Sequence, residues 1–219
     1  MVNILLSYPH ILALTVWIIV AFLSVFRYLH IAPFTRVSWK LLIIFTIVFH
    51  LGYAVLLSWG QYVQWASNDF TKALLMAPLS PETPLPIFLK WARAYLEQPL
   101  GYFAFYSFGR FFLGSIVLFI LTGFFALLLK LRARYQPINF AESDIPAIVL
   151  AVLISGWPGV VVLVPLGFLF AVLISLGARI LYGIERVYLP PAFLIAAPIA
   201  IVGGSSILRF LDLYLLLKL

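Results

Sequence analysis

The sequence predicts an all-α, polytopic membrane protein with six transmembrane helices and an amphipathic helix at the outer interface. Hydrophobic residues make up 65% of the 219 residues and charged residues only 10%, whereas soluble domains are about half apolar and a quarter charged. Several apolar stretches approach the roughly 20 residues with which a helix crosses the ~30 Å hydrocarbon core. Their apolar residues are continuous and do not alternate, as in SIVLFILTGFFALLL at 115–129, which excludes the strands of a membrane barrel.

Three spans are expected in the first part of the chain, at about 4–26, 41–59 and 111–129. The connection between the first two is basic, with Arg27, Arg36 and Lys40. The third span ends at KLRAR, which is again basic.

Three more spans are expected in the second part of the chain, at about 145–155, 160–181 and 192–207. The first two form a helical hairpin, because GWPG at 156–159 interrupts a continuous apolar run with residues that end helices. The first arm of this hairpin is short. A further charged connection with Arg179, Glu185 and Arg186 leads into the last span.

The distribution of charge predicts the orientation in the membrane. All three basic connections fall on one side of a six-span arrangement, and the positive-inside rule makes this side cytoplasmic and puts both termini outside. The net charge of +7 is therefore explained by topology, and we expect no nucleic-acid partner.

The outer loop at 60–100 is the one long polar stretch, and we expect the whole chain to form a single membrane domain around it. Prolines in MAPLSPETPLP predict an extended or turn-like spacer. The following IFLKWARAYLE at 87–97 has helical periodicity, with apolar and charged residues on different faces. This helix either lies in the membrane interface or packs on the spans as a lid.

Glu142 and Asp144 stand immediately before the fourth apolar run, in AESDIP. An Asp at a helix N-cap followed by a Pro in the first turn is a common structural arrangement. Ionisable groups at membrane depth are costly, however, and tend to mark functional sites. Asp144 is therefore expected to be either a helix cap alone or part of a functional site.

Three motifs follow one another in the C-terminal part: AESD at 141–144, IPAIVLAVLISGWPG at 145–159, and YLPPAFLIAAPIAIVGG at 188–204. In this order they resemble the type IV prepilin peptidase and archaeal preflagellin peptidase family, six-span aspartyl proteases of the membrane. In that family the aspartate of a GxGD motif opens the fourth span, a Gly-Trp-type turn follows, and the last span begins with an Ile-Pro-Phe-Gly-Pro-Phe-like stretch. The resemblance implies a prokaryotic plasma membrane protein that cuts prepilin-like leader peptides, with Asp144 as a catalytic aspartate.

The sequence departs from this family at the residues that matter for catalysis. Ala141 and Ser143 replace the two glycines of the motif. The family's first aspartate lies about seven residues before an Ile-Pro pair, and the corresponding residue here is Phe26. Since an aspartic protease needs two carboxylates that share a proton, the resemblance implies an incomplete dyad. Glu142 is the nearest alternative carboxylate, although side chains two residues apart do not face each other on a helix.

An alternative function is a non-catalytic subunit of a larger membrane complex, in contact with lipid and other membrane subunits. His50 lies mid-span and could bind a pigment in this alternative, but a lone histidine in a span more often donates a hydrogen bond to a neighbouring helix. We expect no cofactor and no metal site for the peptidase-like protein, because the chain has no cysteine and no Walker, dinucleotide-binding or HExxH motif.

Overall fold

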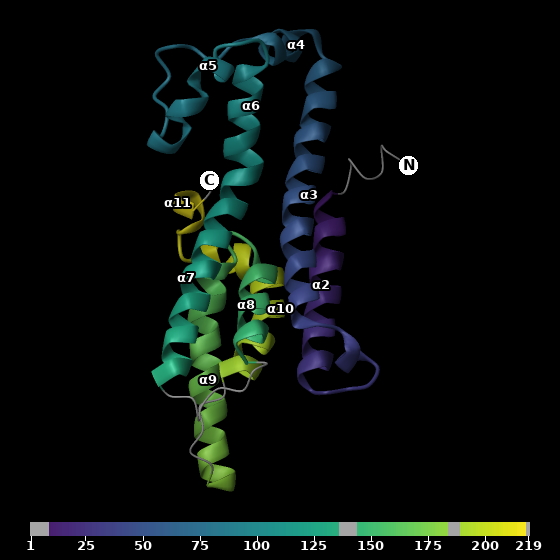
Figure 1. Ribbon diagram of the computed structural model, residues 1–219, viewed down its shortest axis with the longest axis vertical. Helices are drawn as coiled ribbons and strands as arrows, with labels where there is room; N and C mark the ends of the chain where they lie inside the picture. Colours follow the sequence, from purple (N-terminus) through teal and green to yellow (C-terminus); the bar gives the residue numbers. More distant parts are fainter. Residues whose placement is uncertain (1–8, 136–143, 184–188, 218–219) are drawn as a thin grey trace. The chain divides into compact units, whose positions relative to one another are not determined.

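The computed structural model describes residues 9–135, 144–183 and 189–217, and within these ranges all regular secondary structure is helical (Figure 1). Five helical stretches there are long and apolar enough to cross a membrane. The prediction of an all-helical membrane protein is therefore confirmed at this level.

The observed helices extend beyond most of the predicted spans. The first two are α2 (Pro9–Tyr28) and α3 (Trp39–Ala66). The third is a continuous helical stretch made of α6 (Gly101–Ser107), a π-helical turn (Phe108–Phe112) and α7 (Leu113–Tyr135). The last two are α9 (Val160–Tyr182) and α10 (Leu189–Phe210).

The predicted hairpin is present, but its first arm is too short to span a membrane. Helix α8 (Asp144–Ser155) has 12 residues, which at 1.5 Å per residue gives about 18 Å against a core of ~30 Å. The chain then turns at Gly156, whose φ of 65° is left-handed and suits glycine, before α9 begins. The hairpin thus pairs a half-length helix with a full-length one.

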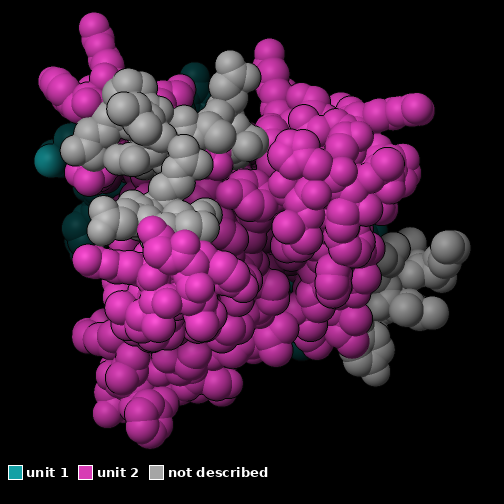
Figure 2. Space-filling model, turned by 90° about the horizontal axis from the view of Figure 1, so that it is seen from below, with its two compact units in different colours: residues 1–7, 51–114, 219 teal, residues 8–50, 115–218 magenta. Residues whose placement is uncertain are grey.

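The described chain divides into two compact units, which Figure 2 distinguishes by colour. Unit 2 consists of Tyr8–His50 and Ser115–Lys218, and its central helix is α10, which packs against α2, α8 and α9. The fully buried Phe193 of α10 contacts the rings of Phe125 and Phe168. Gly167 of α9 makes room for this ring, because a Cβ at Gly167 would lie 2.8 Å from it.

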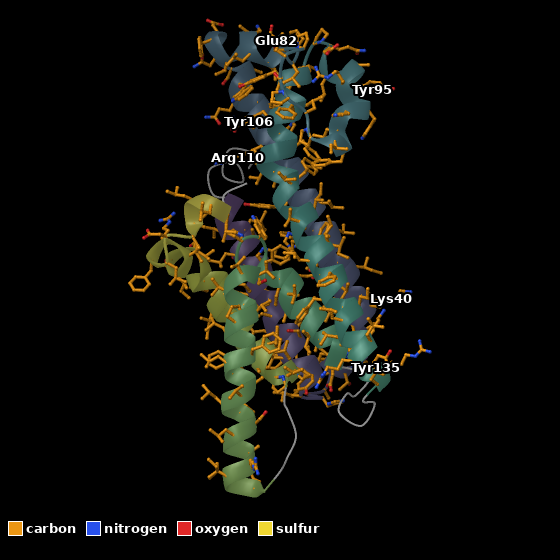
Figure 3. All side chains as sticks on the ribbon, turned by 90° about the vertical axis from the view of Figure 1, so that its left-hand side faces the viewer. Lys40, Glu82, Tyr95, Tyr106, Arg110 and Tyr135 are labelled. Carbon is orange, nitrogen blue, oxygen red and sulfur yellow. The ribbon has the colours of Figure 1, made fainter. Side chains whose placement is uncertain are left out.

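The basic connections of unit 2 lie toward one of its ends. Figure 1 shows the α2–α3 connection and the C-terminal ends of α7 and α9 at the same end of this unit. Lys40 follows the first residue of α3, and Tyr135 is the last residue of α7; both are labelled in Figure 3.

Unit 1 contains residues Leu51–Gly114 and forms a small folded lobe. It includes α4 (Asp69–Met76), a 3₁₀ helix (Ile87–Ala92) and the single-turn α5 (Arg93–Leu96). The Pro-rich segment between α4 and the 3₁₀ helix is free of helix, as predicted. The helix expected at 87–97 differs from the prediction, because its first half is 3₁₀ and only one turn is α-helical.

The Pro-rich segment of unit 1 is packed in place. Leu79 and Leu85 from this segment form a buried cluster with Leu96 of α5. The guanidinium of Arg93 donates to the carbonyl of Pro81 at 2.6 Å and to that of Thr83 at 2.8 Å. This loop is therefore fixed by its own core and by one arginine, and it is more than a spacer.

Aromatic side chains join α3 to α6 inside unit 1. Trp65 of α3 contacts the rings of Tyr102, Phe103 and Tyr106, with centroid distances of 5.0 to 6.2 Å. Tyr62, one turn earlier, meets Phe103 at 5.8 Å. This packing accounts for helices that continue past the polar residues at which the sequence predicted them to end.

Candidate functional site

Helix α8 carries Asp144 at one end, and the residues around it explain why the helix starts there. Asp144 is the first residue assigned to α8, and its side chain is partly exposed. A carboxylate in the first turn faces the positive end of the helix dipole. Pro146 also belongs to this turn, where its missing N–H leaves no hydrogen bond unmade. Glu142 lies outside the described residues.

Nearly all of α8 after its first turn is enclosed by protein. From Ala147 to Ser155 every residue except Val149 is buried, on all sides of the helix. The enclosing helices are α2, α9 and α10. A helix that is apolar and buried all round belongs to the interior of a larger structure. The Asp144 end is therefore the part of α8 where a polar side chain can be reached from outside the protein.

The opposite end of α8 lies beside the C-terminal part of α10. A Cβ on Gly159 would be 3.4 Å from the carbonyl oxygen of Ala200, and one on Gly204 would be 3.5 Å from the Cα of Gly159. The indole N–H of Trp157 donates to the carbonyl of Leu217 at 2.9 Å, which ties the short helix α11 (Tyr214–Leu217) to the hairpin turn. Gly204 therefore allows close packing of α10 against the hairpin turn.

Asp144 and Asp212 are the two carboxylates among the described residues of unit 2, and Asp212 follows α10. The contacts of Gly159 and Trp157 put this end of α10 next to the C-terminal end of α8, whereas Asp144 is a full helix length of about 18 Å away. Asp212 and Asp144 therefore do not form a dyad.

Phe26 occupies a structural place in this unit. Its ring contacts Phe34 at 5.1 Å and Phe22 at 6.2 Å, so that it packs the connection after α2 against the helix. Next to it, the guanidinium of Arg27 lies over the ring of Trp39 at 5.9 Å and donates to the carbonyl of Thr35. The first turn after α2 is held by aromatic and cation–π contacts.

His50 hydrogen-bonds the C-terminal end of α8. Its Nε2 lies 2.9 Å from the carbonyl oxygen of Leu153, and because a carbonyl can only accept, Nε2–H is the donor. Leu153 is among the last residues of α8, whose carbonyls lack partners within the helix. The imidazole is buried, and it stacks on Trp17 at 4.4 Å with the Phe119 ring edge at 5.8 Å.

This geometry defines what His50 can do chemically. Nε2 already has a partner, so a pigment metal could use only Nδ1, unless the hydrogen bond to Leu153 broke. Across the described ranges, no group of three or more His, Cys, Asp or Glu residues is placed to hold a metal ion. The role that the structure gives His50 is an interhelical hydrogen bond that caps α8.

The contact between His50 and Leu153 was not foreseen from the sequence, because 103 residues separate the two. The sequence did indicate the acceptor side of this contact, because GWPG ends α8 abruptly and the last carbonyls of a buried helix need donors. The sequence predicted a hydrogen bond from His50 to a neighbouring helix but gave no means to choose that helix.

Comparison with protein-family models, with curated proteins and with solved structures finds no match to this chain. The resemblance to prepilin peptidases therefore depends on the motifs quoted above, and the function is argued from the residues themselves.

Proposed function

We propose that this protein is an integral membrane protein built like a prepilin peptidase but unable to cut, and that it acts as a non-catalytic subunit of a membrane complex. The observation that supports this proposal most directly is the packing of the Phe26 side chain. Where the family resemblance calls for a carboxylate, the chain has an aromatic ring packed on Phe34 and Phe22. A ring in this place cannot share a proton with Asp144.

The arrangement in the membrane that goes with this proposal has six membrane helices, of which α8 enters only part of the way before the chain returns through α9. The basic end of unit 2 faces the cytoplasm, in agreement with the positive-inside rule, and both termini are outside. The membrane is the plasma membrane of a prokaryote, as the resemblance implies. Prepilin-like proteins or other membrane subunits are the partners expected from it.

The second candidate function is an active aspartic endopeptidase, and the position of Asp144 favours it. Asp144 opens a short helix that ends in a Gly-Trp turn, which is the order of features in the resembled family. In this candidate Glu142, two residues before Asp144 in the sequence, supplies the second carboxylate. The two candidates differ in one testable respect, which is whether the natural sequence cleaves.

Cleavage of prepilin-like peptides in lipid vesicles, measured by mass spectrometry, separates the candidates. We would compare the natural sequence with Asp144→Asn and Phe26→Asp, and use Phe26→Leu as the control for loss of the aromatic contacts. The proposal expects intact peptides with the natural sequence, and cutting by Phe26→Asp alone would identify a protease scaffold that lost its dyad. Cleavage by the natural sequence that Asp144→Asn abolishes would establish the endopeptidase.

A further inference from the structure

An aromatic stripe is exposed on the lobe of unit 1. We use this name for Ile87, Phe88, Trp91 and Tyr95, whose side chains are 84%, 57%, 76% and 70% exposed. They come from the 3₁₀ helix and α5, and Tyr95 is marked in Figure 3. Large apolar side chains gathered at one place on a surface indicate contact with something other than water.

The lobe does not need the stripe for its own folding. The opposite side of the same segment supplies its core, where Leu85 and Leu96 are buried with Leu79 and are joined by Ala92. Arg93 is also turned inward, to the carbonyls of Pro81 and Thr83. Lys90, the one charged residue of the 3₁₀ helix, is exposed.

The part of the stripe around Phe88 lies at a defined level along the α6–α7 helix, and the Trp91 indole reaches the Phe88 carbonyl. Tyr95 lies further out, because the neighbouring Leu96 adjoins Gly101 at the start of α6. In Figure 1 the segment before α5 folds back alongside α6, and the Phe88 ring contacts that of Phe108 at 6.5 Å. Phe108 starts the π-helical turn, two residues before Arg110. The uncharged run of α7 begins at Leu113, about 7 Å further along the helix axis.

Arg110 indicates where the hydrocarbon core of the membrane begins along this helix. Its side chain is exposed on a helix that is long and apolar enough to span the membrane. An exposed guanidinium in the hydrocarbon core is costly, so Arg110 belongs at the headgroup level with α7 entering the core below it. The interfacial layer adds roughly 5 to 8 Å on each side of the core, which includes the level of Phe108 and Phe88.

We propose that the aromatic stripe is an interfacial anchor, whose Ile87, Phe88 and Trp91 lie between the headgroups and the acyl chains of the membrane that the chain itself spans, with Tyr95 further out. Trp and Tyr are enriched in this layer because their rings are apolar and their N–H or O–H groups are polar. Lys90 extends toward the lipid phosphates from the same segment. One end of the lobe is thereby held at the membrane surface, and Arg93 and the leucine cluster keep the stripe in place.

The test uses the absence of cysteine from the chain, which allows single nitroxide labels without removing native thiols. Labels at Ile87→Cys and Tyr95→Cys would be compared in phosphatidylcholine–phosphatidylglycerol vesicles with two controls. Glu82→Cys reports the exposed polar side of the lobe, and Phe124→Cys reports the exposed, apolar surface of α7. The readout is the ratio of collision rates with oxygen and with a water-soluble nickel chelate, which rises with depth.

The proposal expects the ratio at Ile87→Cys to exceed those at Tyr95→Cys and Glu82→Cys and to stay below that at Phe124→Cys. A ratio at Ile87→Cys equal to that at Glu82→Cys would put this part of the stripe in water and overturn the proposal. Low collision rates with both reagents would show that protein covers the stripe, a second copy or another subunit, and would overturn it equally.

Discussion

The two arms of the hairpin, α8 and α9, have nearly the same apolar character and opposite surroundings. Helix α8 is enclosed from Ala147 to Ser155, whereas α9 exposes a row of large apolar side chains: Phe168, Leu169, Val172, Leu173, Leu176 and Ile180. Apolar composition therefore does not determine whether a helix faces protein or lipid. Helix length explains part of the difference. A 12-residue helix cannot reach across the bilayer, so the backbone groups at its ends must find hydrogen-bond partners within the protein.

The ends of the two arms differ in the same way. The last turn of α8 receives a donor from His50, and its closing turn is fixed by Gly156 and by contacts of Gly159 with α10. Helix α9 ends at Gly183, whose φ of 67° forms a left-handed cap with its N–H bonded to the carbonyl of Arg179. The end of α8 therefore combines local donors, from the Gly156 N–H to Leu153 and from the Ser155 hydroxyl to Val152, with the distant donor His50, whereas α9 terminates through its own backbone.

The largest expected effect comes from matched leucines on the two arms. Leu150 of α8 is 0% exposed and Leu173 of α9 is 53% exposed. Leu150→Ala should lower the free energy of unfolding by roughly 2 to 5 kcal/mol, because it leaves a cavity among packed helices. Leu173→Ala should change it by less than about 0.5 kcal/mol. Unfolding with graded dodecyl sulfate in mixed micelles measures both, and equal losses would contradict the difference between the arms.

The next effect concerns the turn between the arms. A Cβ at Gly159 would lie 2.3 Å from the carbonyl oxygen of Ser155, whereas nothing lies within 4 Å of one at Gly177 in α9. Gly159→Ala should therefore cost about 1 to 3 kcal/mol of unfolding free energy through forced backbone movement. Gly177→Ala, at an unhindered helical position, should be neutral or slightly stabilising. A Gly159→Ala protein as stable as the natural one would show that the turn is not closely packed.

A smaller effect is expected at the cap of α8. His50→Phe keeps a ring against Trp17 but removes the donor to the Leu153 carbonyl. We expect a loss of roughly 0.5 to 1.5 kcal/mol in the same unfolding assay. The purified natural protein should show no visible absorbance band. A band that His50→Phe abolishes would establish the pigment-binding alternative.

The smallest effect should appear at the C-terminal segment. Trp157→Phe removes the hydrogen bond to the carbonyl of Leu217, which is worth about 0.5 to 1 kcal/mol. Faster hydrogen exchange confined to α11 is the expected signature. Trp91→Phe is the matched control, because the Trp91 indole bonds only within its own turn, to the carbonyl of Phe88. Unchanged exchange in α11 would mean that other contacts hold this segment.

Local sequence signals predicted the helices and the interruptions between them. Continuous apolar runs gave the spans, GWPG gave the hairpin, and the prolines of MAPLSPETPLP gave a segment without helix. These features depend on neighbouring residues along the chain, so that one sequence is enough to recognise them.

The features that the sequence did not predict depend on contacts between distant residues. Helix α3 continues to Ala66, past Gln61 and Gln64, because Tyr62 and Trp65 pack on rings of α6. The enclosure of α8 and its bond to His50 also require knowledge of which helices are neighbours. Asp144 was selected by position in the sequence, but a dyad is a distance between side chains, and a linear pattern contains no such distance.

Cleavage by the natural sequence is the most direct test of the functional account. The protein in vesicles would be incubated with prepilin-like peptides that carry short basic leaders, beside Asp144→Asn, and the masses of the products recorded. The account predicts intact peptides with both proteins, since an aspartic protease needs two carboxylates and Phe26 packs as a ring where the resemblance calls for one. Products formed by the natural sequence and absent with Asp144→Asn would contradict it and make Asp144 a catalytic residue.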